Sequence, residues 1–217
     1  MSKKEDSFIL ESLINIFTVE KGKLKVLLER KKEDPYKGYW ILPKETLKKE
    51  TTLEITIESI LNRTINTSKI YTEQNYTFSK IDRYPGSRVI TTSYIGLVDN
   101  KKVKLNDELE LNWFNLEELP KIGYDHKGII ENAQQLLKTK LVNTTILKNL
   151  FPNEFTLPEL QSVFESIMNK KLDRRNFRKK FLTLNLIEET GNNNLGGSGR
   201  PAKLYKFKEN IKDINLF

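Results

Sequence analysis

Two helix patterns and a glycine-rich turn constrain the last third of this 217-residue chain more than any other feature. The segments "TLPELQSVFESIM" and "DRRNFRKKFLTLNL" carry apolar residues at helical spacing, and only "NKKL" separates them. Thr156 and Asp173 occupy N-cap positions, and Pro158 falls in a first helical turn. The following "LIEETGNNNLGGSGRPAKLYKF" reads as strand, turn and strand. Helix, turn, helix and hairpin together predict a winged helix.

Charge is distributed unevenly along the chain, whose net charge is +8. Residues 1–137 hold 22 Lys+Arg against 21 Asp+Glu, net +1, whereas residues 138–217 hold 15 against 8, net +7. Such an asymmetry indicates a polyanionic partner for the C-terminal part. Nucleic acid is favoured over a membrane because no basic amphipathic anchor accompanies the charge. A merely solvated basic surface, or a basic protein-interaction module, is the alternative.

The second helix of the predicted winged helix carries a row of cations opposite its apolar stripe. Arginine and asparagine are the side chains that reach base edges and phosphates from a helix in a major groove. The glycine-rich stretch "GGSG" at 196–199 predicts a flexible hairpin tip that presents cations to phosphates or a minor groove. "GGSG" lacks the lysine and hydroxyl of a P-loop. The residues expected to contact DNA are Arg174, Arg175, Asn176, Arg178, Lys179, Arg200 and Lys203.

The first 140 residues show an α+β pattern. "FILESLINIFTV" and "KLKVLLER" flank a turn with Gly22 and read as paired strands. Helical spacing follows at residues 53–64, and "YTEQNYTFS", "RVITTSYIGLV" and "LELNWFNLEEL" read as strands. "PKIGYDHKGIIENAQQLLKTKL" then predicts a helix that bridges two domains. We expect domains at residues 1–140 and 145–217.

The stretch "WILPKETLKKETTLEITIESILNRT" resembles the loop and helix of a Nudix box, the motif that holds a divalent cation for diphosphate hydrolysis. Aligned on "WILP", the carboxylates of the box are replaced by Thr51, Ile60, Arg63 and Thr64, and its last glycine by Asn66. Such chemistry needs carboxylates clustered on one helix face. Arg63 would instead bring a positive charge to the cation position. No metal site and no catalytic residue are therefore expected, although Glu50, Glu54 and Glu58 leave a divergent Nudix hydrolase as the alternative.

A Nudix-like domain joined to a winged helix resembles the Nudix-related transcriptional regulators of the NrtR and AraR type. The resemblance covers nearly the whole chain and is carried by "IDRYPGSRVITTSY", "YDHKGIIENA", "FPNEFTLPELQSVFESIMNKKLDRRNFRKKF" and "GRPAKLYKF". It implies an N-terminal Nudix-like α/β/α sandwich with a C-terminal winged helix-turn-helix domain. It also implies a homodimer that binds a palindromic double-stranded DNA operator. In the family, known effectors include ADP-ribose and arabinose, and this sequence does not choose between them. Repression is expected rather than activation.

Four side chains are expected to contact a sugar or nucleotide-sugar effector. Arginine pairs bidentately with phosphate, and tryptophan stacks on a base or sugar. The candidates are Arg30, Trp40, Arg83 and Arg88. For each of them a structural role, in the core or in organising the "YPG" turn, is the alternative. His126, the sole histidine, is expected to fix the start of the bridge helix rather than act as a base.

Composition limits the other classes of function. The chain has no cysteine, which excludes disulfides, thiolate nucleophiles and sulfur-based zinc sites. The N-terminal segment has no apolar signal region, and no later window has the apolar run of a membrane span. We therefore expect a cytoplasmic protein without a membrane partner and without a cofactor.

Overall fold

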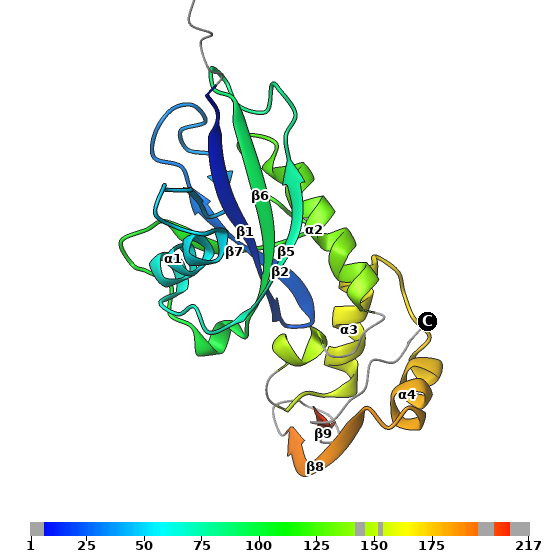
Figure 1. The fold of residues 1–217 in the computed structure, drawn as a ribbon. Helices are drawn as coiled ribbons and strands as arrows, with labels where there is room; N and C mark the ends of the chain where they lie inside the picture. The colour runs from blue at the N-terminus through cyan, green and yellow to red at the C-terminus, as the bar shows by residue number, and fades with distance from the viewer. Residues whose placement is uncertain (1–6, 142–145, 152–153, 195–201, 209–217) are drawn as a thin grey trace, which may run out of the picture.

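A sheet with helices on both faces and a smaller domain of helices with a β-hairpin make up the computed structural model (Figure 1). The structure describes residues 7–141, 146–151, 154–194 and 202–208. The glycine-rich stretch at 196–199 and Arg200, expected at the hairpin tip, lie outside this range. The N-terminal and C-terminal parts have the predicted architecture, a mixed α+β Nudix-like domain followed by a winged helix.

The central sheet has the strand order β3-β2-β1-β6-β5, with β4 paired to β1 and β7 paired to β2. Strands β1 and β6 run parallel, and the other pairs are antiparallel. Lys21 and Gly22 join β1 to β2 with positive φ angles of 50° and 72°, as a tight two-residue hairpin requires. The strands are β1 (Ile9–Glu20), β2 (Lys23–Arg30), β3 (Trp40–Ile41), β4 (Lys44–Thr46), β5 (Tyr71–Phe78), β6 (Val89–Leu97) and β7 (Leu111–Asn115).

Helices α1 (Leu53–Ile65) and α2 (His126–Lys140) cover opposite faces of this sheet. The side chain of Thr52 caps the start of α1, and Asn66 ends it in the left-handed conformation. The apolar side chains that α1 buries against the sheet are Ile57, Ile60, Leu61 and Ile65, and those of α2 are Ile129, Ile130, Ala133 and Leu137. The predicted α/β/α sandwich is confirmed.

The smaller domain follows the predicted order of helix, helix and hairpin. Its elements are α3 (Leu157–Met168), α4 (Arg174–Thr183), β8 (Ile187–Asn194) and β9 (Ala202–Phe207). The two short 3-10 helices are η1 (Asn100–Lys102), which follows β6, and η2 (Ile146–Asn149), which precedes α3. Phe164 of α3 packs edge-on against Phe177 and Phe181 of α4, with ring centroids 5.3 Å apart in both pairs. Among the described residues, no helix combines the length and apolarity that crossing a membrane requires.

The two parts share one continuous apolar core at the junction between α2 and α3. The Leu24 backbone N–H donates to Ser166 Oγ (3.2 Å), and Gln134 Nε2 donates to the Ile167 carbonyl (3.4 Å). Gly22, at the tip of the β1–β2 hairpin, lies so close to α3 that a Cβ there would be 2.5 Å from Ser162 Oγ. The helix α3 therefore contacts both the sheet and α2.

The capping box of α3 yields a stability prediction. Thr156 Oγ1 accepts from the Glu159 backbone N–H (3.3 Å), and Glu159 Oε2 accepts from the Thr156 backbone N–H (2.8 Å). Thr156→Ala should lower the free energy of unfolding by about 1 kcal/mol, because a helix N–H loses its acceptor. Thr156→Ser keeps the hydroxyl and should remain near wild type. Chemical denaturation measures both, and an alanine variant as stable as the serine variant would contradict this role.

Candidate functional site

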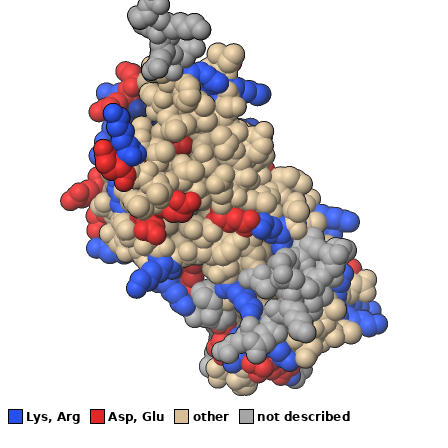
Figure 2. All heavy atoms as spheres, viewed as in Figure 1, with Lys and Arg blue, Asp and Glu red and all other residues tan. Residues whose placement is uncertain are grey.

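The exposed side of α4 carries the cations and the amide that the sequence singled out. Phe177 and Phe181 point inward and are buried, which leaves the polar residues of the helix outward. Asp173 caps the helix by accepting from the Asn176 backbone N–H (2.8 Å). In Figure 2 blue side chains lie along the outer edge of the lower lobe, where Figure 1 shows α4. The exposed residues on this face are Arg174, Arg175, Asn176, Arg178 and Lys179.

A basic groove of about 730 Å³ lies between α4, the start of α3 and the hairpin. Of the residues that the structure describes here, the cations that line it are Arg174, Arg178 and Lys203. Lys203 Nζ donates to both carboxylate oxygens of Glu189, at 2.9 and 2.8 Å. That hydrogen bond, aided more weakly by the charge of Arg178, holds the pKa of Glu189 below its usual range. The winged helix thus presents a concave cationic surface with one carboxylate at its border.

A second cavity, of about 640 Å³, lies in the Nudix-like domain between the end of β5 and the start of α2. Its wall is aromatic and polar, the combination typical of small-molecule sites. Two cations and two carboxylates contribute to it, Lys80 and Arg83 against Asp82 and Asp125. The remaining lining residues are Tyr36, Tyr76, Thr77, Phe78, Ser79, Tyr124, Gly128, Ile129 and Asn132.

Arg83 is the predicted effector residue that reaches this cavity. Its guanidinium donates to Asp125 through Nε (2.6 Å) and Nη2 (3.0 Å), and through Nη1 to the Phe78 carbonyl (2.9 Å). The Arg83 side chain is 2% exposed, whereas that of Asp125 is 36% exposed. The Arg83 side chain is therefore held in place by its hydrogen bonds, whereas the carboxylate of Asp125 is partly exposed to the cavity.

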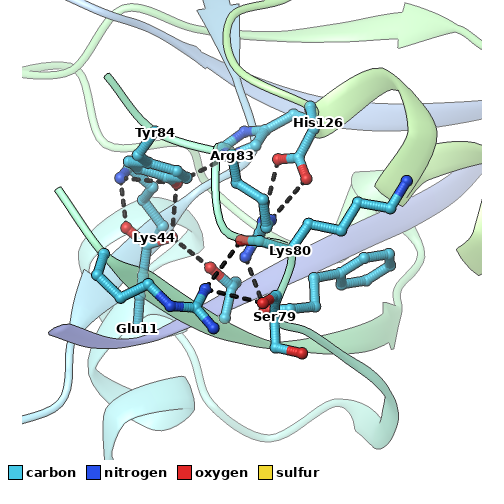
Figure 3. A network of polar contacts seen from close by, with 11 residues as sticks. Glu11, Lys44, Ser79, Lys80, Arg83, Tyr84 and His126 are labelled. Carbon is cyan, nitrogen blue, oxygen red and sulfur yellow. Dashed lines mark hydrogen bonds and ion pairs between the residues drawn. The ribbon is translucent and has the colours of Figure 1, made fainter. Parts of the chain in front are cut away.

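The other three predicted effector residues have structural contacts elsewhere. Arg88 Nη1 donates to the carbonyls of Ser79 (2.8 Å) and Lys80 (2.9 Å), so it holds the loop that borders the cavity (Figure 3). Arg30 pairs with Glu110 at 2.7 Å on an exposed surface. Trp40 packs edge-on against Phe114 with ring centroids 4.6 Å apart. None of the three lines the cavity beside Arg83.

A buried polar network lies behind the cavity wall (Figure 3). The Leu42 backbone N–H donates to His126 Nδ1 (3.0 Å), which leaves the proton on Nε2, 3.3 Å from the Tyr84 hydroxyl. That hydroxyl donates to Glu11 Oε1 (2.7 Å) and accepts from Lys44 (3.2 Å), which also forms an ion pair with Glu11. Burial raises the pKa of Tyr84, and the charge of Glu11 raises it further. The network ties the first residue of α2 to strands β1 and β4 and to the backbone of Leu42 between β3 and β4.

Tyrosines form the part of the site that the sequence did not predict. Tyr84 stacks on Tyr124 with ring centroids 4.2 Å apart, and Tyr36 approaches Tyr124 at 4.8 Å. Lys44 Nζ lies 4.7 Å from the Tyr84 ring centre and 4.9 Å from that of Tyr124. Each tyrosine adjoins a glycine or proline turn in the sequence, but nothing in their spacing shows that they meet.

The helix of the degenerate Nudix box presents no cluster of carboxylates toward one point. Glu50, Glu54 and Glu58 are exposed. Arg63 instead donates to both oxygens of Glu29 on β2, at 3.1 and 2.9 Å. Over residues 7–141, 146–151, 154–194 and 202–208 there is no group of three His, Cys, Asp or Glu residues placed to hold a metal ion. An arginine of this helix thus pairs with Glu29, a carboxylate of the sheet that lies beside it.

The buried His126 yields a prediction about pH. Burial, together with the charges of Lys44 and Arg83, holds the pKa of His126 well below its usual value near 6.5. Its neutral form stabilises the fold above pH 6.5, and this stability is lost as the pH falls below that value, because the unfolded chain then binds a proton that the folded chain does not. The slope should approach about 1.4 kcal/mol per pH unit.

Chemical denaturation between pH 7.5 and about 5, above the range in which most carboxylates titrate, measures this slope. His126→Asn keeps an acceptor for the Leu42 N–H but cannot be protonated, so it should flatten the slope even if its stability at pH 7.5 is lower. Equal slopes for the two proteins would show that His126 is not the responsible group.

Comparisons with known proteins agree with both parts of this description. Residues 148–207 match the family described as the NrtR DNA-binding winged helix domain. The chain is 29% identical over 207 residues to a protein of Acinetobacter baylyi named "ADPR responsive transcriptional repressor NtrR", covering 93% of this chain and 82% of that protein. It is 32% identical over 110 residues to an ADP-ribose pyrophosphatase of Methanocaldococcus jannaschii, covering 50% of this chain and 64% of that enzyme.

Among solved structures, the chain resembles Shewanella oneidensis NrtR in complex with a 27mer DNA. The TM-score is 0.74 and the identity 27%, and the match covers 92% of this chain and 93% of that one. The similarity therefore includes both the sheet domain and the winged helix, in one arrangement.

Proposed function

Because the chain is of the NrtR type, a Nudix-like domain followed by the NrtR winged helix, we propose that it is an ADP-ribose-responsive transcriptional repressor. The observation that carries this proposal is the basic groove beside α4, in the domain that matches the NrtR winged helix. Residues 145–217 would bind an operator, and residues 1–140 would bind the effector. The proposed localisation is the cytoplasm, because a repressor has to reach the DNA that it regulates.

The proposed DNA contacts divide into two kinds. Arg174, Arg175, Asn176, Arg178 and Lys179 project from α4 as recognition-helix residues do, and would contact base edges and phosphates in a major groove. Lys203 lies on the hairpin and would contact a phosphate. Arg200 is proposed for the same role from the sequence. Two copies of the chain, as a homodimer, would place two such helices on a palindromic operator.

The cavity between β5 and α2 is the proposed effector site. Its tyrosines offer rings for stacking on a base or ribose, and Arg83 offers paired donors for a phosphate. The relative from Acinetobacter baylyi is named for its response to ADPR, so ADP-ribose is the effector we propose. Arg88 would support the site by holding its loop. Arg30 and Trp40 lie outside the cavity and would contact an effector only if it extended beyond it.

A second candidate function is hydrolysis of ADP-ribose, which the similarity to an ADP-ribose pyrophosphatase favours. The replacements at Thr51, Ile60, Arg63 and Thr64 argue against it, as does the pairing of Arg63 with Glu29. We propose a non-catalytic domain. Incubation of the protein with ADP-ribose and magnesium, followed by quantification of AMP and ribose phosphate, decides between the two, with the glutamine variants of Glu50, Glu54 and Glu58 as the test of any turnover.

Removal of one groove cation should weaken operator binding in a measurable way. Arg178→Ala should cost about 1–3 kcal/mol at a site selected from genomic fragments, if this arginine reads a base. Lys69→Ala removes a cation from the exposed surface of the other domain and should leave the affinity unchanged. Fluorescence anisotropy over a salt series measures both, and the wild type should show a steep negative salt slope. Equal losses from the two variants would contradict a localised DNA site.

Addition of ADP-ribose should release the operator. If the effector favours a state of the dimer that cannot span both half-sites, the DNA dissociation constant should rise by about 5–150-fold at saturating effector. Operators with five base pairs inserted between the half-sites should bind poorly, because the second recognition helix would then face the wrong side of the duplex. An unchanged dissociation constant with bound ADP-ribose would rule out this effector as the regulator.

A further inference from the structure

The described residues that line the proposed effector cavity carry no net charge, because Lys80 and Arg83 are offset by Asp82 and Asp125. An anionic ligand therefore gains little from entering unless one carboxylate moves away from a cation. Asp125 is the carboxylate that covers the donors of Arg83, since it accepts from both Nε and Nη2. These two donors form the edge of a guanidinium that pairs bidentately with a phosphate.

Asp125 is also the N-cap residue of α2, yet its side chain makes no capping hydrogen bond. An aspartate at this position ordinarily accepts from the backbone N–H groups of the first turn. Here the carboxylate is held by Arg83 instead. The start of α2 thus lacks a side-chain cap. Asp125 has φ −91° and ψ 15°, so its carboxylate can supply the cap only if its backbone also turns toward the extended conformation typical of N-cap residues.

We propose that a phosphate of the effector replaces Asp125 as the ion-pair partner of Arg83, and that the released Asp125 carboxylate then caps α2. This inference rests on the proposed function and deepens it. Asp125, rather than Arg83, is the partner that moves. The Arg83 side chain is enclosed and keeps its hydrogen bond to the Phe78 carbonyl, whereas Asp125 borders the open cavity. The exchange selects for a phosphorylated ligand, because a neutral sugar offers no charge to compensate Arg83 once Asp125 has left.

The exchange would affect the winged helix because α2 contacts both parts of the molecule. Its first residue, His126, belongs to the buried network behind the cavity. Toward its other end, Leu137 lies in the core shared with α3, and Gln134 donates to the Ile167 carbonyl. In Figure 1, α2 runs along the sheet toward α3. A change in the first turn of α2 can therefore alter the position of α3 through the core that the two helices share.

The test uses the full-length protein and two variants with the same loss of charge on or beside α2. Asp125→Asn can still cap the helix but cannot form the ion pair, so it should behave as if the effector were bound. Its operator affinity without ligand should fall at least about fivefold, and its affinity for ADP-ribose should rise, because the state that binds the effector is then more populated. Glu131→Gln, on the exposed face of α2 and outside the cavity, should match the wild type in both measurements.

Anisotropy measures operator binding, calorimetry measures ADP-ribose binding, and hydrogen exchange at residues 126–129 reports the capping of α2. Protection of these amides should rise with ADP-ribose in the wild type and be high in Asp125→Asn without ligand. A variant that responds to ADP-ribose as the wild type does, with unchanged protection, overturns the exchange. An affinity for arabinose that equals that for ADP-ribose overturns the selection for phosphate.

Failure of the proposed function is distinguishable from failure of this inference. If the wild type binds neither operator nor ADP-ribose, the repressor proposal fails, and inorganic pyrophosphate then serves as the probe of the cavity. Pyrophosphate that increases protection at residues 126–129 in the wild type but not in Asp125→Asn supports the exchange. Pyrophosphate without effect on these amides, or with the same effect in both proteins, contradicts it.

Discussion

The packing of α2 is the contact on which the rest of the structure depends. One side of this helix buries Ile129, Ile130 and Ala133 against the sheet, and Leu137 continues the same apolar core toward α3. Apolar burial is worth roughly 25 cal/mol per Å², so a stripe shared by two domains stabilises both folds and their relative position at once. A linker of polar residues would have allowed the domains to move independently. Here α2 begins at the cavity beside Arg83 and, toward its other end, belongs to the apolar core shared with the winged helix.

Much of this fold was accessible from local patterns in the sequence. The N-caps Thr156 and Asp173 were identifiable because the preference for a side-chain oxygen at a helix start is a property of a few neighbouring residues. The replacement of the box glycine by Asn66 was also visible, and the structure shows why the helix tolerates it, since asparagine adopts the left-handed conformation with φ 56°. The basic face of α4 followed from helical spacing alone.

The candidate effector site was less accessible, because it is assembled from residues far apart in the chain. Arg83 was singled out for its chemistry, but its partner Asp125 lies 42 residues away and read only as part of a helix start. Trp40 drew attention as a large ring, yet its environment of strand β3 and Phe114 makes it a packing residue. The stack of Tyr84 on Tyr124 depends on a β-strand register and a loop path that single-sequence periodicity does not encode.

The carboxylate beside the basic groove has a kinetic consequence. Lys203 is already paired with Glu189, so a phosphate that binds this lysine has to replace an existing partner rather than meet a free charge. In the proposed DNA complex, random DNA, which offers phosphates alone, would therefore gain less from Lys203 than from an unpaired cation, and it would dissociate sooner. Under the proposed function, an operator that also pairs with the exposed side chains of α4 would offset that loss. A repressor built in this way would then spend less time on random DNA than one with a free lysine at this position.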